Sequence, residues 1–121
     1  ERWHKMALGA QFFLACLNAP ITKKAVENPI MHEHAAALIG SRADQFVQPW
    51  QHGYKEMKAT GFHLRNLPPL KPSNVVGPPP YDVAERRKWA KVHQASPGPD
   101  RSKDRSRSCP GIMQAMAAQW G

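Results

Sequence analysis

Cysteine is scarce in this chain of 121 residues, which contains only Cys16 and Cys109. Two thiols are too few for the disulfide framework that stabilises small secreted domains, and their spacing matches no metal-binding signature. In a chain that is not secreted, isolated cysteines usually behave as small apolar residues. We therefore interpret both thiols as inert, with a single bridge between them as the alternative, and we expect no metal or other cofactor.

Acidic residues are also few, and most of the nine stand beside basic residues in polar stretches. General acid and base catalysis instead uses paired carboxylates in apolar surroundings. We find no serine, cysteine or threonine with a supporting base, and no glycine-rich phosphate loop after a strand. The sequence therefore predicts no catalytic residue, no enzyme activity and no small-molecule substrate.

The six histidines raise the question of a metal site, above all in the segment His32-Glu33-His34. On a helix, residues two apart point about 200° away from each other, whereas two ligands of one ion need a spacing of three or four. We interpret these side chains as surface or interface histidines.

Strand periodicity is missing, because no alternation of apolar and polar residues with a period of two persists along the chain. The sequence instead predicts a mostly α fold of several short helices, joined by an extended Pro-rich segment and a basic low-complexity loop. We divide it into an apolar helical region at 1–61, an extended Pro-rich strap at 62–81, and a region at 82–121 with a basic helix, an Arg/Ser loop and a short C-terminal helix. So much of the chain lies outside any core that we do not expect an independent compact domain.

Proline, by contrast, is abundant, and six of the 12 prolines lie between Arg65 and Tyr81. Each proline fixes φ and removes a backbone donor, so this segment is predicted to run extended rather than as a helix or central strand. About 17 residues at polyproline rise reach roughly 50 Å, enough to bridge separate subunits. The run Pro78-Pro79-Pro80-Tyr81 also matches the PPxY pattern that WW domains bind.

The most apolar segment is residues 3–19, which predicts a helix that is apolar nearly all round and ends at Pro20. Such a helix must be buried in protein or in lipid. Lys5 and Lys23 bracket 17 residues, the lower limit for a membrane span of roughly 17 to 25 residues. A spanning helix therefore stays an alternative to a helix packed against protein.

Further helices are expected on both sides of the strap. A charged link at 22–28 precedes a helix at 29–48, because Asn28-Pro29 supplies a cap followed by proline. This helix is expected to break near Gly40, and apolar residues at helical spacing predict another helix at 49–61.

Beyond the strap, Asp82 and Glu85 form a capping box for a basic helix expected to run to about Ala95. A low-complexity stretch follows at 96–108, and a last short helix is expected at 110–119.

The whole chain has a net charge of +8, and most of this positive charge lies in its second half. Residues 1–54 contain five basic and four acidic residues, whereas residues 55–121 contain 12 and five. This excess points to an acidic protein surface, RNA or anionic lipid headgroups as partner. The residues expected to bind partners are the large side chains of the first helix, the strap and the basic region: Trp3, Phe12, Phe13, Pro68, Pro69, Pro78, Pro79, Pro80, Tyr81, Arg86, Arg87, Lys88, Lys91, Arg101, Arg105 and Arg107.

These features predict a non-catalytic accessory subunit of a large mitochondrial inner-membrane complex of the respiratory chain. The strap would hold neighbouring protein subunits together, and residues 3–19 would meet protein or membrane lipid. The chain begins at Glu1 rather than Met, as removal of a mitochondrial presequence or a shortened chain would leave it. Two alternatives stay open: a mitochondrial ribosomal protein that binds rRNA through its basic half, and a WW-domain-binding adaptor that uses Pro78 to Tyr81.

Overall fold

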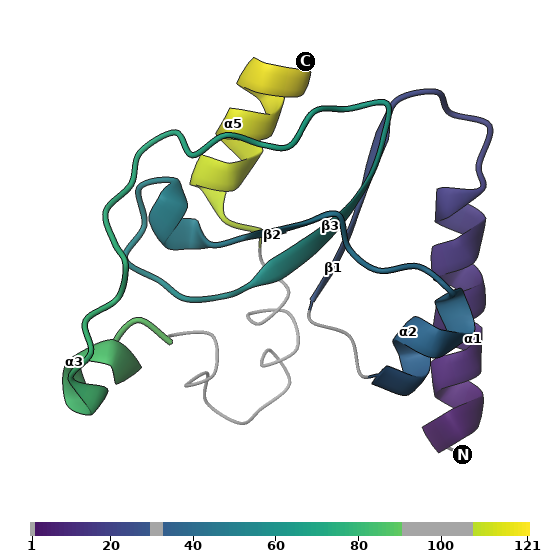
Figure 1. Cartoon of the computed structure of the whole chain (residues 1–121), viewed down its shortest axis with the longest axis horizontal. Coiled ribbons are helices and arrows are strands. Elements are labelled where there is room, and N and C mark those ends of the chain that lie inside the picture. Colours follow the sequence, from purple (N-terminus) through teal and green to yellow (C-terminus); the bar gives the residue numbers. More distant parts are fainter. Residues whose placement is uncertain (1, 30–32, 91–107) are drawn as a thin grey trace. The chain divides into compact units, whose positions relative to one another are not determined.

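The computed structural model describes residues 2–29, 33–90 and 108–121 (Figure 1). By internal contacts the chain divides into unit 1, Glu1–Phe46 with Thr60–Pro69, and unit 2, Val47–Ala59 with Leu70–Gly121. The elements in chain order are α1 (Arg2–Leu17), β1 (Lys24–Pro29), α2 (Glu33–Ile39), β2 (Gln45–Val47), the 3₁₀ helix η1 (Pro49–Gln51), β3 (Thr60–Arg65), α3 (Val83–Arg87) and α5 (Pro110–Trp120).

The fold is mixed α/β, so the prediction of a mostly α fold was wrong. About 42% of the described residues are helical and 16% lie in strands. The strands form one antiparallel sheet of three with the order β1-β3-β2. Strand β3 is therefore central, and β1 is an edge strand.

Strand β3 was missed because it shows no alternation of buried and exposed residues. Its first four residues, Thr60 to His63, are all buried. A strand covered on both faces gives no period-two pattern, which needs one face in water. The predicted strap accordingly begins too early, since residues 62–65 belong to this strand.

Strand β1 occupies the segment that we expected to be a charged link and a helix start. It pairs antiparallel with β3, in a register that runs from Lys24 opposite Arg65 to Pro29 opposite Thr60. Proline is tolerated at the end of an edge strand, because no ladder hydrogen bond need be donated there. Helix α2 begins only at Glu33 and ends at Ile39, at the predicted break, where Gly40 has a φ of 70°. The prediction that the helix resumes and runs to 48 was wrong, since residues 41–44 form a loop and Gln45–Val47 form β2.

The helix predicted at 49–61 is reduced to the single turn η1. Two side chains turn back on the backbone here: the Gln48 N–H donates to Oε1 of Gln51 at 2.9 Å, and the Lys58 N–H donates to Oε1 of Gln48 at 2.9 Å. The first is a capping-box bond at the start of η1, whereas the second bonds Lys58 to the residue before η1, so its N–H is not part of a helical ladder. Gly61, the last residue of the predicted helix, lies inside β3.

Helix α1 is confirmed close to its predicted limits, and it packs beside α2 in unit 1 (Figure 1). Its buried residues Ala10, Phe13 and Leu17 recur at helical spacing and share a core cluster with Ile39 of α2. Fully burying a Phe or Leu side chain contributes roughly 1.5–3 kcal/mol, so this stripe sets which side of α1 faces inward. Among the described residues, no helix is both long enough and apolar enough to cross a bilayer.

Residues 66–81 contain no helix and no named strand, as the prolines predict, and residues 70–81 of this segment belong to unit 2. Their inner side is hydrogen-bonded to the chain itself: the N–H groups of Ser73 and Asn74 donate to the Gln51 carbonyl, each at 3.2 Å. The Lys71 N–H donates to Oε1 of Gln119 in α5 at 2.8 Å, and the Gln119 side-chain amide returns a bond to the Lys71 carbonyl at 2.9 Å. The strap is therefore fixed along unit 2.

Of the two helices predicted after the strap, the first is shorter than predicted and the second has nearly the predicted length. Asp82 caps α3, since its carboxylate accepts from the Glu85 N–H at 3.0 Å, but α3 ends at Arg87, with Lys88 and Trp89 in a turn. Residues 91–95 of the predicted helix lie outside the described residues. The C-terminal helix is confirmed as α5, which buries Gly111, Ile112 and Ala115.

A matched pair of helix glycines tests this packing. A Cβ added to Gly9 meets nothing within 4 Å, so Gly9→Ala should raise the free energy of unfolding by about 0.5–1 kcal/mol through helix propensity. A Cβ on Gly111 would collide with the His52 carbonyl oxygen and lie 2.9 Å from the Tyr54 ring, so Gly111→Ala should lower it by about 1–3 kcal/mol. Urea denaturation followed by circular dichroism measures both, and changes of the same sign would contradict this packing.

Candidate functional site

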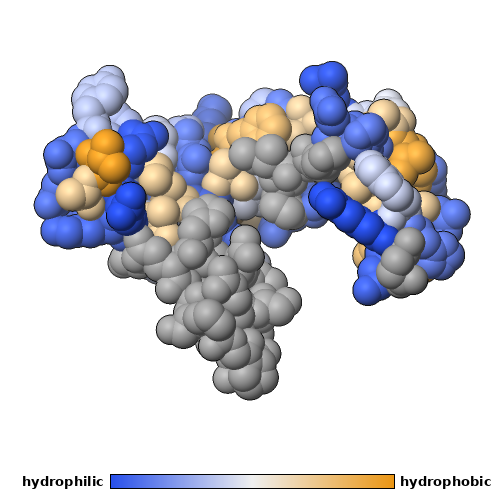
Figure 2. All heavy atoms as spheres, turned by 90° about the horizontal axis from the view of Figure 1, so that it is seen from below, coloured by the Kyte–Doolittle hydropathy of each residue, from blue (hydrophilic) through white to orange (hydrophobic). Residues whose placement is uncertain are grey.

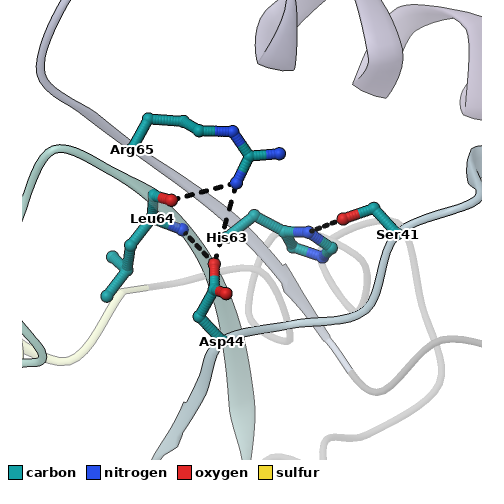
Figure 3. A network of polar contacts seen from close by, with 5 residues as sticks. All are labelled: Ser41, Asp44, His63, Leu64 and Arg65. Atoms are coloured by element: carbon teal, nitrogen blue, oxygen red, sulfur yellow. Dashed lines mark hydrogen bonds and ion pairs between the residues drawn. The ribbon is translucent and has the colours of Figure 1, made fainter.

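A polar network surrounds His63 in the middle of unit 1 (Figure 3). Strand β3 carries the imidazole, which is 0% exposed, and the loop after α2 brings the Ser41 hydroxyl within 3.2 Å of Nδ1. The ring of Phe13 meets the imidazole edge-on, with centroids 4.7 Å apart and planes at 72°. Among the described residues, the other ring nitrogen, Nε2, has no hydrogen-bond partner. Burial of the ring disfavours its charged form.

Asp44 fastens the same loop to β3. Its Oδ2 accepts from the Leu64 N–H at 2.7 Å and lies 3.8 Å from Nη1 of Arg65, while its own N–H donates to the Phe62 carbonyl at 2.8 Å. Half of the Asp44 side chain is exposed, so the ion pair with Arg65 is screened and contributes little. The backbone bonds are what position the loop.

The Ser41–His63 pair has the residue types of a nucleophile and a base, but its geometry serves structure. A base must come within hydrogen-bond reach of the reacting group, and the fully buried imidazole offers no approach to a substrate. Burial lowers the pKa of His63, the carboxylate of Asp44 partly offsets this, and the charge of Arg65 lowers it further. The network joins the loop after α2 to the sheet.

Unit 2 has a similar histidine–serine pair just after η1, in which His52 is buried and Ser73 is exposed. His52 is 3% exposed, and its Nδ1 lies 2.8 Å from Oγ of Ser73 in the strap. Burial lowers the pKa of His52 as well. The pair holds the strap in place, as the backbone bonds on either side of it do.

An open cavity of about 600 Å³ lies in unit 1 among α1, β1 and α2. Its lining is mostly apolar and includes Gly9, Phe12 and Phe13 of α1. The few polar residues are Cys16 of α1, and Glu27 and Asn28 of β1. This volume falls within the range of about 300–1,000 Å³ that small-molecule sites occupy.

The apolar residues predicted to bind partners divide between surface and core. Trp3 is 58% exposed and meets the His34 ring edge-on, with ring centroids 4.9 Å apart. Phe12 is 73% exposed. Phe13 is buried instead, because it packs against His63. Figure 2 shows hydrophobic residues in separate patches among hydrophilic ones on the face that it draws.

The predicted strap residues also divide. Pro68, Pro69 and Pro78 are exposed, Pro79 is buried and Pro80 is half-buried. Tyr81 follows them with 98% of its surface exposed.

Three of the predicted basic residues lie together on α3 and directly after it. Arg86, Arg87 and Lys88 are all exposed. Arg86 donates to the Pro80 carbonyl at 3.4 Å, and Lys88 forms an ion pair with Glu85 at 3.0 Å. The other four lie outside the described residues: Lys91, Arg101, Arg105 and Arg107.

Sequence reasoning missed both the His63 network and the cavity. Ser41 and His63 are 22 positions apart, and nothing local in either segment indicates that they meet. The cavity likewise arises only once β1 lies beside α1. Among residues 2–29, 33–90 and 108–121, no group of three or more His, Cys, Asp or Glu side chains is placed to hold a metal ion; His32 lies outside those ranges.

Comparison with known proteins adds no relative. No family model, no curated protein and no solved structure matches this chain. Its function must therefore be argued from its own residues.

The two buried histidines predict loss of stability in acid. Their pKa values lie below the ordinary 6.5 in the folded chain, so at lower pH the unfolded chain binds protons that the folded chain does not. Stability should be full above pH 6.5 and should fall as the pH drops from there toward the lowered values. Urea midpoints between about pH 7.5 and pH 5 measure this change.

His63→Phe should make the midpoint less dependent on pH, whereas His4→Gln should not, because the His4 side chain is exposed. Titration of the His63 ring by NMR gives the pKa directly. A value at or above 6.5 would show that the imidazole is not buried as described.

Proposed function

We propose that this chain is a non-catalytic accessory subunit of a large mitochondrial inner-membrane complex of the respiratory chain, which it stabilises by binding neighbouring subunits. The observation that carries the proposal is the exposure of three large aromatic side chains, Trp3, Phe12 and Tyr81, at 58%, 73% and 98%. Aromatic residues are enriched at protein interfaces, where they act as buried anchors. A small protein that leaves such side chains in water gains by covering them with a partner.

Helix α1 supports this proposal because one of its sides is buried in the core and the other exposes apolar residues. Its inner stripe is occupied by the core of unit 1, so Phe12 and Leu8, four positions apart, face away from that core at 73% and 52% exposure. Apolar residues four apart on a helix form one patch. This patch suits an apolar surface of a neighbouring subunit or membrane lipid.

The strap supports the proposal in a modified form. Because its inner side is bonded to unit 2, residues 71–76 do not span a gap between subunits. Their outer side presents Val75, 56% exposed, and the strap ends on Tyr81. A backbone fixed in advance loses less entropy on binding, so the strap is a preformed contact surface.

The basic residues Arg86, Arg87 and Lys88 supply charge beside Tyr81. They are exposed and suit an acidic surface, which would steer and orient the partner more than it would add affinity. The same charges would suit rRNA phosphates, which is the ribosomal alternative. The WW-adaptor alternative is favoured by the exposure of Tyr81 but opposed by the burial of Pro79.

Affinity purification from gently solubilised mitochondria tests the proposal. The tagged full chain should co-purify in near-stoichiometric amounts with subunits of one inner-membrane complex and should migrate with it on native gels. Phe12→Ser and Tyr81→Ala should reduce that recovery severalfold, because each removes an exposed anchor. Met113→Ser is the control, since Met113 is 56% exposed on α5 and is not one of the proposed contacts.

Three other results would contradict the proposal. Recovery of the chain alone would show that it has no stable partner. Recovery with ribosomal proteins, with release by nuclease and by salt, would favour the rRNA alternative. Recovery of a WW-domain protein that is lost on Tyr81→Ala would favour the adaptor.

A further inference from the structure

Residues 2–26, which include helix α1, carry positive charge with no negative charge among them. The sequence has four basic residues and no acidic residue in this segment. Three of the four, Arg2, Lys5 and Lys23, are exposed. Two of these stand in the first turn of α1 and the third follows the end of the helix, so positive charge lies at both ends of α1.

Two acidic residues of the neighbouring elements lie away from the outer side of α1. Val26 packs against the core cluster that includes the inner stripe of α1. Successive side chains of a strand point to opposite faces, so that of Glu27 points away from α1. Glu33 begins α2, whose Ile39 packs against the same inner stripe. Neither carboxylate therefore belongs to the outer side of the helix.

Apolar side chains lie on the outer side of α1 between the basic ones. Leu8 and Phe12 are 52% and 73% exposed, and they follow Lys5 at a spacing that places all three on one side of the helix. Beyond the helix, Ile21 is 59% exposed and stands two positions before Lys23. One surface thus combines exposed apolar groups with lysine.

This combination fits the surface of an anionic bilayer better than a protein. Lysine is depleted at protein–protein interfaces. At a bilayer surface, however, the headgroups attract lysine and arginine while the acyl boundary takes up apolar side chains of the same helix. Because the inner stripe of α1 is buried in the core of unit 1, only the outer side of the helix is available to lipid.

From these observations we propose that the outer side of α1 binds the surface of an anionic lipid bilayer. Leu8 and Phe12 enter the acyl boundary, and Arg2, Lys5 and Lys23 lie at the headgroup phosphates. The inference rests on the proposed function, since it names the bilayer as the partner of the α1 patch that the function assigns to either protein or lipid.

Co-sedimentation of the full chain with vesicles tests this inference. One set contains phosphatidylcholine alone, and the other an equal mixture of phosphatidylcholine and phosphatidylglycerol. The chain should bind the anionic vesicles much more tightly than the neutral ones, and salt should weaken this binding. A net charge of +8 attracts any anionic surface, so variants must show which part of the chain binds.

Two variants of α1 and two matched variants of unit 2 locate the contact. Phe12→Ser should weaken binding to anionic vesicles about tenfold, because an apolar anchor is lost. Lys5→Gln should weaken it about fivefold, the effect of one charge near such a surface. Met113→Ser and Arg86→Gln remove an exposed apolar and an exposed basic side chain of unit 2 and should leave binding unchanged. Circular dichroism checks that each variant is folded.

The inference is overturned if Arg86→Gln weakens binding as much as Lys5→Gln, or if Phe12→Ser has no effect, since binding would then follow total charge. It is also overturned if the chain ignores anionic vesicles while Phe12→Ser still lowers recovery of the inner-membrane complex. In that case the patch binds protein and the proposed function stands. Vesicle binding that depends on Phe12, without recovery of any complex, would support the lipid contact and contradict the subunit role.

Discussion

The edge-on contact between Phe13 and His63 joins helix α1 to the sheet, and the architecture of unit 1 depends on it. Both side chains are buried, and burial lowers the pKa of the imidazole. The contact fixes the rotation of α1 about its axis. With Phe13 turned inward, Phe12 is necessarily turned outward, because adjacent helical residues point about 100° apart. The exposed aromatic surface therefore follows from the core.

The same rotation shapes the cavity. It places Gly9 and Phe12 along the side of α1 that β1 and α2 only partly cover. In unit 2 the side chains of His52 and Gln119 form hydrogen bonds with strap residues Ser73 and Lys71. Val75 and Tyr81 of the strap stay exposed to water. In both units a buried histidine lies within hydrogen-bond distance of a serine in a loop, and large apolar side chains are exposed outside.

Local signals in the sequence were enough for the features that depend on a few neighbouring residues. Helices α1 and α5, the Asp82 cap, the end of α2 at Gly40 and the absence of helix in the strap all follow from proline, capping and helical spacing. The sheet depends instead on pairing between distant segments, and β3 is buried on both faces, so neither strand β1 nor β3 left a readable pattern. The sequence did not show that Phe13 would be buried while Phe12 is exposed, because the side chain that packs against Phe13, His63, lies 50 positions away.

The central claim is that the exposed aromatic residues are covered by a partner in the native assembly. Hydroxyl-radical footprinting tests it most directly, by comparing the isolated chain with the chain in solubilised mitochondria. Phe12 and Tyr81, which are 73% and 98% exposed in isolation, should become several times less reactive in the assembly, while buried Phe13 should react weakly in both. Equal reactivity of Phe12 and Tyr81 in both samples would contradict the account.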